Sequence, residues 1–229
     1  MSAARTASHA LFTLLRSEQG LALQMQAPNA PGPVMADFSN PRLTHRIQDA
    51  VQKQSIARAV GIRPGLRPTV IDATAGFGRD AFLLASLGCR VTLIEADALV
   101  HALLEDGLAR ARQRAAGSLL ETLERMQLLQ GDFCQLARQL DAAEVVYLDP
   151  MFPARNKTAR AKKEMYVLQQ YLSSCEPLQA ETALLDAALQ KAQRRVVVKR
   201  GRLSPRIDER EPAFALSGSS CRYDVYLRP

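Results

Sequence analysis

Three residues that could act together on a flat amine, Asp149, Pro150 and Phe152, follow the apolar residues 145–148 in the stretch YLDPMFP. An exocyclic amine on a nucleobase is a poor nucleophile, because its lone pair is delocalised into the ring. The Asp149 carboxylate and the Pro150 carbonyl could accept its N–H groups, and Phe152 could stack on the base. The stretch therefore predicts a clamp for a base, with a plain proline turn capped by Asp149 as the alternative.

A second candidate lies in VIDATAGFGRDAF, where Asp72 ends an apolar run and Gly76 and Gly78 precede a predicted helix. The spacing resembles the D-x-G-x-G-x-G loop of S-adenosylmethionine-dependent methyltransferases, with Thr74 in place of the first glycine. A dinucleotide site would share the turn, but Asp80 at the helix start would repel a phosphate and suits a sulfonium and an ammonium instead. The alternative is that the two glycines only make a tight turn.

Two further acids follow the next apolar runs. Glu95 comes 19 residues after Gly76, where an acid can accept hydrogen bonds from two ribose hydroxyls. Asp132 follows the third run, at a position where methyltransferases often contact the adenine amino group, and the next side chain, Phe133, could pack on the ring. Equally, Asp132 could simply cap a helix over residues 133–140.

Basic residues come directly after the proposed clamp. Five cations stand in nine residues without an acid, namely Arg155, Lys157, Arg160, Lys162 and Lys163. Such a run is often only a solvated face, but its place beside a base pocket favours phosphate binding. Lys199 and Arg200, at the end of a later apolar run, are expected on the same edge of the sheet and are further candidates for binding RNA.

The elements that would position these residues alternate along the chain. Apolar runs at residues 70–71, 91–94, 126–129, 145–148 and 196–198 predict strands, and helices are expected between them, including 98–114 and 178–193. Near-continuous apolar strands separated by helices predict a parallel sheet covered on both faces, an α/β fold. The last run, 223–227, alternates and predicts an edge or antiparallel strand.

Residues 1–44 differ from the rest in being rich in Pro, Gly and Asn. We expect a small extension with an amphipathic helix at its start and a hairpin, followed by the main domain over residues 45–229. A helix over residues 44–60 would open that domain, with Thr44 as its cap and Gly61 as its stop.

Composition narrows the class of protein. The chain has 229 residues, a net charge of +7 and a pI near 9.5, which is consistent with a polyanionic partner such as nucleic acid. Four scattered cysteines without a C-x-x-C pair, and three unrelated histidines, predict reduced thiols, a cytoplasmic location and no metal site. No apolar run approaches the roughly 20 residues of a membrane span, so no membrane partner is expected.

The segments DATAGFGRDAFLLASLGCRV, YLDPMFP, KKEM and RVVVKR together resemble the bacterial methyltransferase J family. The resemblance covers about four fifths of the chain. It implies a Rossmann-like class I methyltransferase fold with a mostly parallel seven-stranded sheet, and S-adenosyl-L-methionine as cofactor. It also implies methylation of the N2 amine of a guanosine near the 3′ end of small-subunit (16S) ribosomal RNA. The partner would be that RNA or an assembling small ribosomal subunit.

By the same resemblance, the cofactor contacts fall on Arg79-Asp80, Glu95-Ala96, Asp132-Phe133 and Asp149. Three alternatives stay open from the residues themselves: an adenine-N6 or glutamine-amide methyltransferase, a nicotinamide-dependent oxidoreductase, and an RNA-binding protein without activity. Asp80 and the lack of a catalytic His, Tyr or Lys near a strand end oppose the oxidoreductase.

Overall fold

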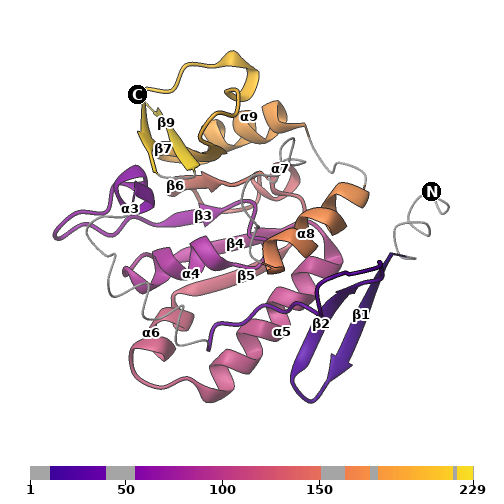
Figure 1. The fold of residues 1–229 in the computed structure, drawn as a ribbon. Helices are drawn as coiled ribbons and strands as arrows, with labels where there is room; N and C mark the ends of the chain where they lie inside the picture. The colour runs from indigo at the N-terminus through magenta and orange to yellow at the C-terminus, as the bar shows by residue number, and fades with distance from the viewer. Residues whose placement is uncertain (1–10, 40–54, 151–162, 176–179, 219–220, 229) are drawn as a thin grey trace.

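The computed structural model describes residues 11–39, 55–150, 163–175, 180–218 and 221–228. A seven-stranded sheet lies at its centre (Figure 1). The strands are β3 (Val70–Asp72), β4 (Val91–Glu95), β5 (Met126–Gln130), β6 (Ala143–Leu148), β7 (Ala192–Gly201), β8 (Phe214–Ser217) and β9 (Cys221–Leu227). Their order is β5-β4-β3-β6-β7-β9-β8. β3 to β7 run parallel, whereas β9 runs antiparallel to β7 and β8. The predicted α/β fold with a mostly parallel seven-stranded sheet is confirmed.

Helices cover both faces of this sheet. They are α3 (Ser55–Val60), α4 (Arg79–Ser86), α5 (Ala98–Arg114), α6 (Ser118–Glu124), α7 (Phe133–Leu136), α8 (Lys163–Ser174) and α9 (Glu181–Lys191), with a 3-10 turn at Ile207–Glu209. Successive strand residues point to opposite faces, so Val145 belongs to a hydrophobic cluster with α4, α5 and α8, while Val146 belongs to one with α7 and α9. This double burial explains why the parallel strands are apolar throughout.

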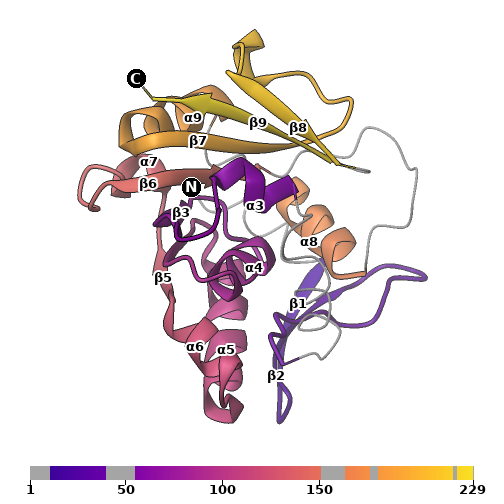
Figure 2. The same ribbon diagram turned by 90° about the vertical axis from the view of Figure 1, so that its left-hand side faces the viewer.

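The N-terminal extension contains a hairpin of β1 (Phe12–Ser17) and β2 (Gly20–Met25), which lies along α5 (Figure 2). The predicted amphipathic helix is therefore wrong from Phe12 onward, and its first residues lie outside the described part of the chain. The reason is tertiary: β2 buries Leu21 and Leu23, and β1 pairs with it in register. A boundary near residue 44 also lies outside the described residues and stays a prediction.

Other differences are small. The predicted helix at 98–114 is confirmed as α5, and α9 is shorter than residues 178–193. Residues 55–60 of the predicted 44–60 helix form α3, and its earlier residues lie outside the described part of the chain. The last predicted strand is antiparallel, as expected, but β8 covers its outer side, so β9 is not an edge strand. Three elements, α6, α8 and β8, were not predicted from the sequence.

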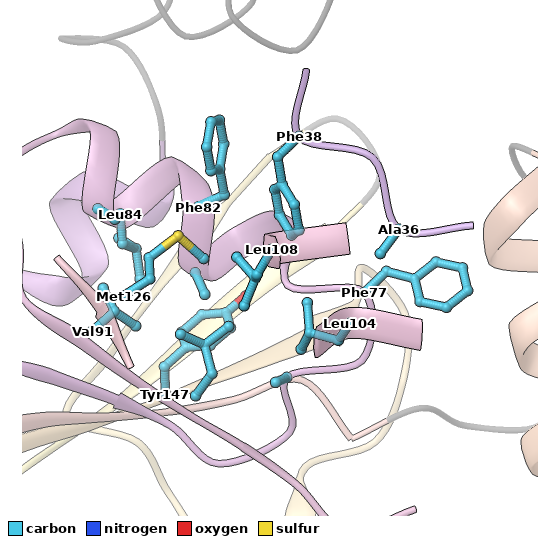
Figure 3. Packing of buried hydrophobic residues seen from close by; sticks show 14 of the residues in the cluster. Ala36, Phe38, Phe77, Phe82, Leu84, Val91, Leu104, Leu108, Met126 and Tyr147 are labelled. Atoms are coloured by element: carbon cyan, nitrogen blue, oxygen red, sulfur yellow. The ribbon is translucent and has the colours of Figure 1, made fainter. Parts of the chain in front are cut away.

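Two features of the fold place the site. β3 and β6 are neighbours, but the strand that follows β3 lies on one side of this pair and the strand that follows β6 lies on the other. In such sheets, ligands bind at this switch point, beside the carboxyl ends of the strands. A packed core supports this edge: Phe38 lies against Phe82, with ring centroids 5.3 Å apart, and Tyr147 is buried in the same cluster (Figure 3). Among the described helices, none has the length and apolar character needed to cross a bilayer.

Candidate active site

The glycine turn after β3 is built as the sequence predicts. Gly76 and Gly78 have φ of +53° and +68°, a left-handed conformation that favours glycine. A Cβ at Gly78 would lie 2.9 Å from Leu104 Cδ1, so the turn also packs closely on α5. The tight-turn interpretation therefore accounts for Gly78, whereas among the described residues a Cβ at Gly76 would meet only Leu168, at 3.6 Å.

Glu95 joins the end of β4 to this turn. Its Oε2 accepts a hydrogen bond from the Gly76 N–H at 2.8 Å, and its Oε1 accepts one from the Asp97 N–H at 2.9 Å. Burial raises its pKa to about 7. Each carboxylate oxygen keeps a second lone pair, so Glu95 can still accept hydrogen bonds from ligand hydroxyls such as those of a ribose.

Three charged groups meet at the carboxyl end of the sheet. Lys199 Nζ, on β7, donates to Asp80 Oδ2 at 2.7 Å and to Asp149 Oδ2 at 2.8 Å. The Tyr147 hydroxyl donates to the same Asp80 oxygen at 2.6 Å. Two acids with one lysine leave the cluster with one net negative charge.

The surroundings of the cluster shift its pKa values. Burial lowers the pKa of Lys199, but Asp80 and Asp149 raise it by more, so Lys199 stays protonated. The pKa of Asp149 is raised by partial burial and by Asp80, with Lys199 opposing the rise. Asp72, at the end of β3, is 2% exposed, and burial raises its pKa to about 8 although the Thr74 N–H bonds to it.

Thr74 connects the two predicted loops. Its Oγ1 accepts a hydrogen bond from the Asp149 N–H at 2.7 Å, which fixes the backbone where β6 ends. Asp149 and Pro150 thus lie beside the glycine turn, as predicted. Other predicted residues lie outside the described part of the chain, and their roles stay predictions: Phe152, Arg155, Lys157, Arg160 and Lys162. Lys163 opens α8 and is exposed.

Asp132 and Phe133 follow β5. Asp132 is the N-cap of α7 and accepts a hydrogen bond from the Gln135 N–H at 3.2 Å, so its predicted capping role is confirmed. Phe133 is only 1% exposed within the second hydrophobic cluster. Its ring therefore offers no free face for packing on an adenine, and a ligand could meet Phe133 only through its backbone.

The expectation that Arg200 faces RNA beside Lys199 is wrong. Neighbouring residues of a strand point to opposite faces, and Arg200 is 4% exposed. Its guanidinium donates to the Pro205 carbonyl at 3.0 and 2.6 Å and pairs with Glu181 at 3.1 Å. Lys199 does reach the predicted edge, but there it binds two carboxylates.

The remaining predicted cofactor residues are also placed at this edge. Arg79 forms an ion pair with Glu164 of α8, which holds that helix over the start of α4. Ala96 follows Glu95 and is half-buried. The role of Tyr147 was not predicted, because this residue lies inside an apolar strand, and neither was the bridging role of Lys199. The sequence signal for this role was the position of Lys199 near the end of the next strand after Asp149-Pro150.

These residues fit S-adenosylmethionine. The glycine turn brings backbone close to a ligand, Glu95 offers acceptors for hydroxyls, and the net negative charge of the Asp80–Lys199–Asp149 cluster suits a sulfonium or an ammonium. In the described part of the chain, no group of three or more His, Cys, Asp or Glu side chains could hold a metal ion.

Comparisons with known proteins agree with this geometry. The SAM_MT family model of SAM-dependent methyltransferases matches residues 3–228. A ribosomal RNA small subunit methyltransferase J from Pseudomonas syringae pv. syringae is 49% identical over 225 residues, covering 96% of this chain and 81% of the relative. One from Stutzerimonas stutzeri is 48% identical over 222 residues, with coverage of 96% and 84%.

A solved structure supports the same assignment. The crystal structure of a SAM-dependent methyltransferase from Neisseria gonorrhoeae superposes with a TM-score of 0.72 at 31% identity, covering 99% of this chain and 92% of the other. Sequence and structure therefore agree over nearly the whole length. The chain belongs to the ribosomal RNA small subunit methyltransferase J family of S-adenosylmethionine-dependent methyltransferases.

Proposed function

We propose that the protein methylates the exocyclic N2 amine of a guanosine in small-subunit (16S) ribosomal RNA, near its 3′ end. The observation that carries the proposal is the double anchoring of Asp149 beside the glycine turn, through Thr74 and Lys199. The names of the relatives support small-subunit ribosomal RNA as the substrate. Such a substrate would place the reaction in the cytoplasm.

Asp149 would accept an N–H of the amine, which frees the nitrogen lone pair as the new bond forms. Lys199 favours the carboxylate form of Asp149 by opposing the rise in its pKa. The Pro150 carbonyl would be the second acceptor, and Phe152 would stack on the base. S-adenosylmethionine, when bound, supplies an electrophilic methyl group.

Glu95 would bind the ribose hydroxyls of the cofactor, and Asp80 would attract its positive charge. Arg79, Ala96 and Asp132 would complete the cofactor site, with Phe133 contributing backbone only. Arg155, Lys157, Arg160, Lys162 and Lys163 would bind RNA phosphates beside the clamp.

The proposal is tested by incubating the protein with labelled S-adenosylmethionine and unmodified small-subunit RNA, then mapping the modified nucleoside. Label on guanine N2 is the expected result. Label only on adenine N6, or none on RNA, would overturn the proposal. Parallel reactions with free RNA and with small-subunit particles identify which form is the substrate.

Asp149→Ala tests the clamp itself. We expect methyl transfer to fall by at least about 100-fold, because a preorganised acceptor is lost where charge develops. Cofactor affinity, measured by calorimetry, should change only a few-fold. A folded Asp149→Ala protein with full activity would refute the role of Asp149.

A further inference from the structure

A cavity of about 250 Å³ lies at the opposite edge of the sheet from Asp149, where β6 and β7 begin. Four of its lining side chains are arginines: Arg58, Arg63, Arg194 and Arg195. Val145 of β6 also lines it, and Asp149, which follows this strand, comes four residues later, a separation of about 13 Å. Figure 1 shows α3, which carries Arg58, at one end of the sheet and α8 at the other.

The positive charge of this cavity is poorly neutralised. Arg194 pairs with Glu144 at 3.2 Å, and Arg195 Nη1 donates to the Ala59 carbonyl at 3.0 Å. Within the described ranges, Arg58, Arg63 and Arg195 form no ion pair with a carboxylate.

Arg195 is the least satisfied of the four. Its Nε is buried and has no hydrogen-bond partner among the described residues. Burial, followed by the like charges of Arg194 and Arg63, lowers its pKa. A buried donor without an acceptor costs about 1–3 kcal/mol. An anion in the cavity would relieve the repulsion among these guanidinium groups.

The backbone is also shaped around this guanidinium. Gly61, just after α3, has φ of +86°, and a Cβ there would lie 3.1 Å from Arg195 Cζ and Nη1. Glycine thus lets the end of α3 close over Arg195. The cavity is smaller than the roughly 300–1,000 Å³ of drug-sized sites, which suits a small anion.

We propose that this arginine cavity binds a phosphate group. Guanidinium groups present planar pairs of donors that match phosphate oxygens, and several of them favour a multiply charged oxyanion over chloride. The phosphate would come from the backbone of the substrate RNA or from a free phosphate. The RNA source rests on the proposed function; the site itself does not.

The first experiment uses inorganic phosphate alone, titrated by calorimetry at constant ionic strength into wild type, Arg63→Gln, Arg58→Gln/Arg63→Gln and Arg114→Gln. Arg114 is an exposed arginine at the end of α5 and is the matched control. We expect the Kd for phosphate to rise at least about fivefold in the double variant and to stay unchanged in the control. Equal affinity in all four proteins, or no binding to wild type, would overturn the proposal.

The second experiment identifies the source by measuring RNA affinity against salt concentration for the same proteins. If the RNA backbone occupies the cavity, the double variant binds RNA more weakly. The plot of the logarithm of its binding constant against the logarithm of the salt concentration becomes less steep by about 0.7–0.9, which corresponds to one lost phosphate contact. If only free phosphate binds, RNA affinity is unchanged while the phosphate result stands. The phosphate titration needs neither RNA nor S-adenosylmethionine, so its failure is distinguishable from a failure of methyl transfer.

Discussion

Lys199 allows the carboxylates of Asp80 and Asp149 to lie close together in one site. Asp80 and Asp149 both bind its ammonium, at 2.7 and 2.8 Å. Without that cation they would repel each other, and the pKa of Asp149 would rise further, because Lys199 now opposes the effect of burial. The lysine is thus a positioning residue that keeps Asp149 able to accept hydrogen bonds.

Replacing Lys199 by methionine should expose this role. We expect methyl transfer to drop by roughly 10–100-fold at neutral pH and the acid limb of the pH–rate profile to move to higher pH, because protonated Asp149 cannot serve as a full acceptor. Lys199→Arg keeps the charge and should restore part of the wild-type profile. A uniform loss of rate with an unchanged profile would contradict the electrostatic role.

Thr74 occupies the position of a glycine in the usual methyltransferase loop. A glycine there could not accept the hydrogen bond that the Thr74 hydroxyl accepts from the Asp149 N–H. In Thr74→Val the Asp149 N–H loses its acceptor, and we expect kcat to fall about tenfold with little change in the KM for S-adenosylmethionine. Thr74→Ser retains the hydroxyl and is the matched control. Steady-state kinetics of both variants check the prediction; equal rates in Thr74→Val and Thr74→Ser would count against it.

At the scale of elements, α5 carries the N-terminal extension. Asp106 accepts a hydrogen bond from the Leu21 N–H at 3.0 Å, and Arg110 donates to the Ala36 carbonyl at 2.7 Å. Phe38, in the same extension, packs under the glycine turn, within reach of a Cβ at Gly78. The extension therefore packs against the glycine turn after β3 and stabilises it.

At Gly107 the backbone of this extension lies very close to α5. A Cβ there would lie 2.6 Å from the Ala36 carbonyl oxygen. We expect Gly107→Ala to lower the free energy of unfolding by about 1–3 kcal/mol, against the gain of about 1 kcal/mol that helix propensity alone would bring.

Urea denaturation measures the effect of Gly107→Ala. Ala109→Gly, at an exposed position of the same helix, gives the propensity term by itself and should cost about 1 kcal/mol. A stabilised Gly107→Ala protein would show that the extension does not pack as closely as described.

At the scale of the whole molecule, buried acids make stability depend on pH. The pKa of Asp72 rises from 3.8 to about 8, and that of Glu95 from 4.5 to about 7, in both cases chiefly through burial. The folded protein therefore holds protons that the unfolded chain releases. Stability should fall as pH rises from about 4 to 8, by up to about 1.4 kcal/mol per pH unit for each group.

Asp72→Asn replaces the titratable carboxyl group with a neutral amide of similar size, so the proton uptake of Asp72 no longer contributes to stability. We expect this variant to be at least about 1 kcal/mol more stable than wild type at pH 8, with the difference shrinking toward pH 4. Urea titrations across this range check it, with the exposed Asp141→Asn as control. A pH dependence equal to that of wild type would show that Asp72 is ionised in the folded state.

Local patterns were enough to predict the central strands, α5 and the glycine turn, because each depends on residues that are neighbours in the chain. Phe12–Ser17 was misread as helical, since only its partner strand and α5 make it a strand. α8 escaped notice because it begins in a run of cations, although Val167, Leu168 and Tyr171 form a buried face.

The sequence alone determined the chemistry of the site: a glycine turn, an acid after each of several strands, and the Asp149-Pro150 stretch. Only the tertiary structure decided that Lys199 bridges Asp80 and Asp149, which lie 119 and 50 residues from it. It also decided that Arg200 is buried and that four arginines share a cavity. The physical reason is that strand order and side-chain alternation bring distant residues together, and neither is written in the spacing of any one motif.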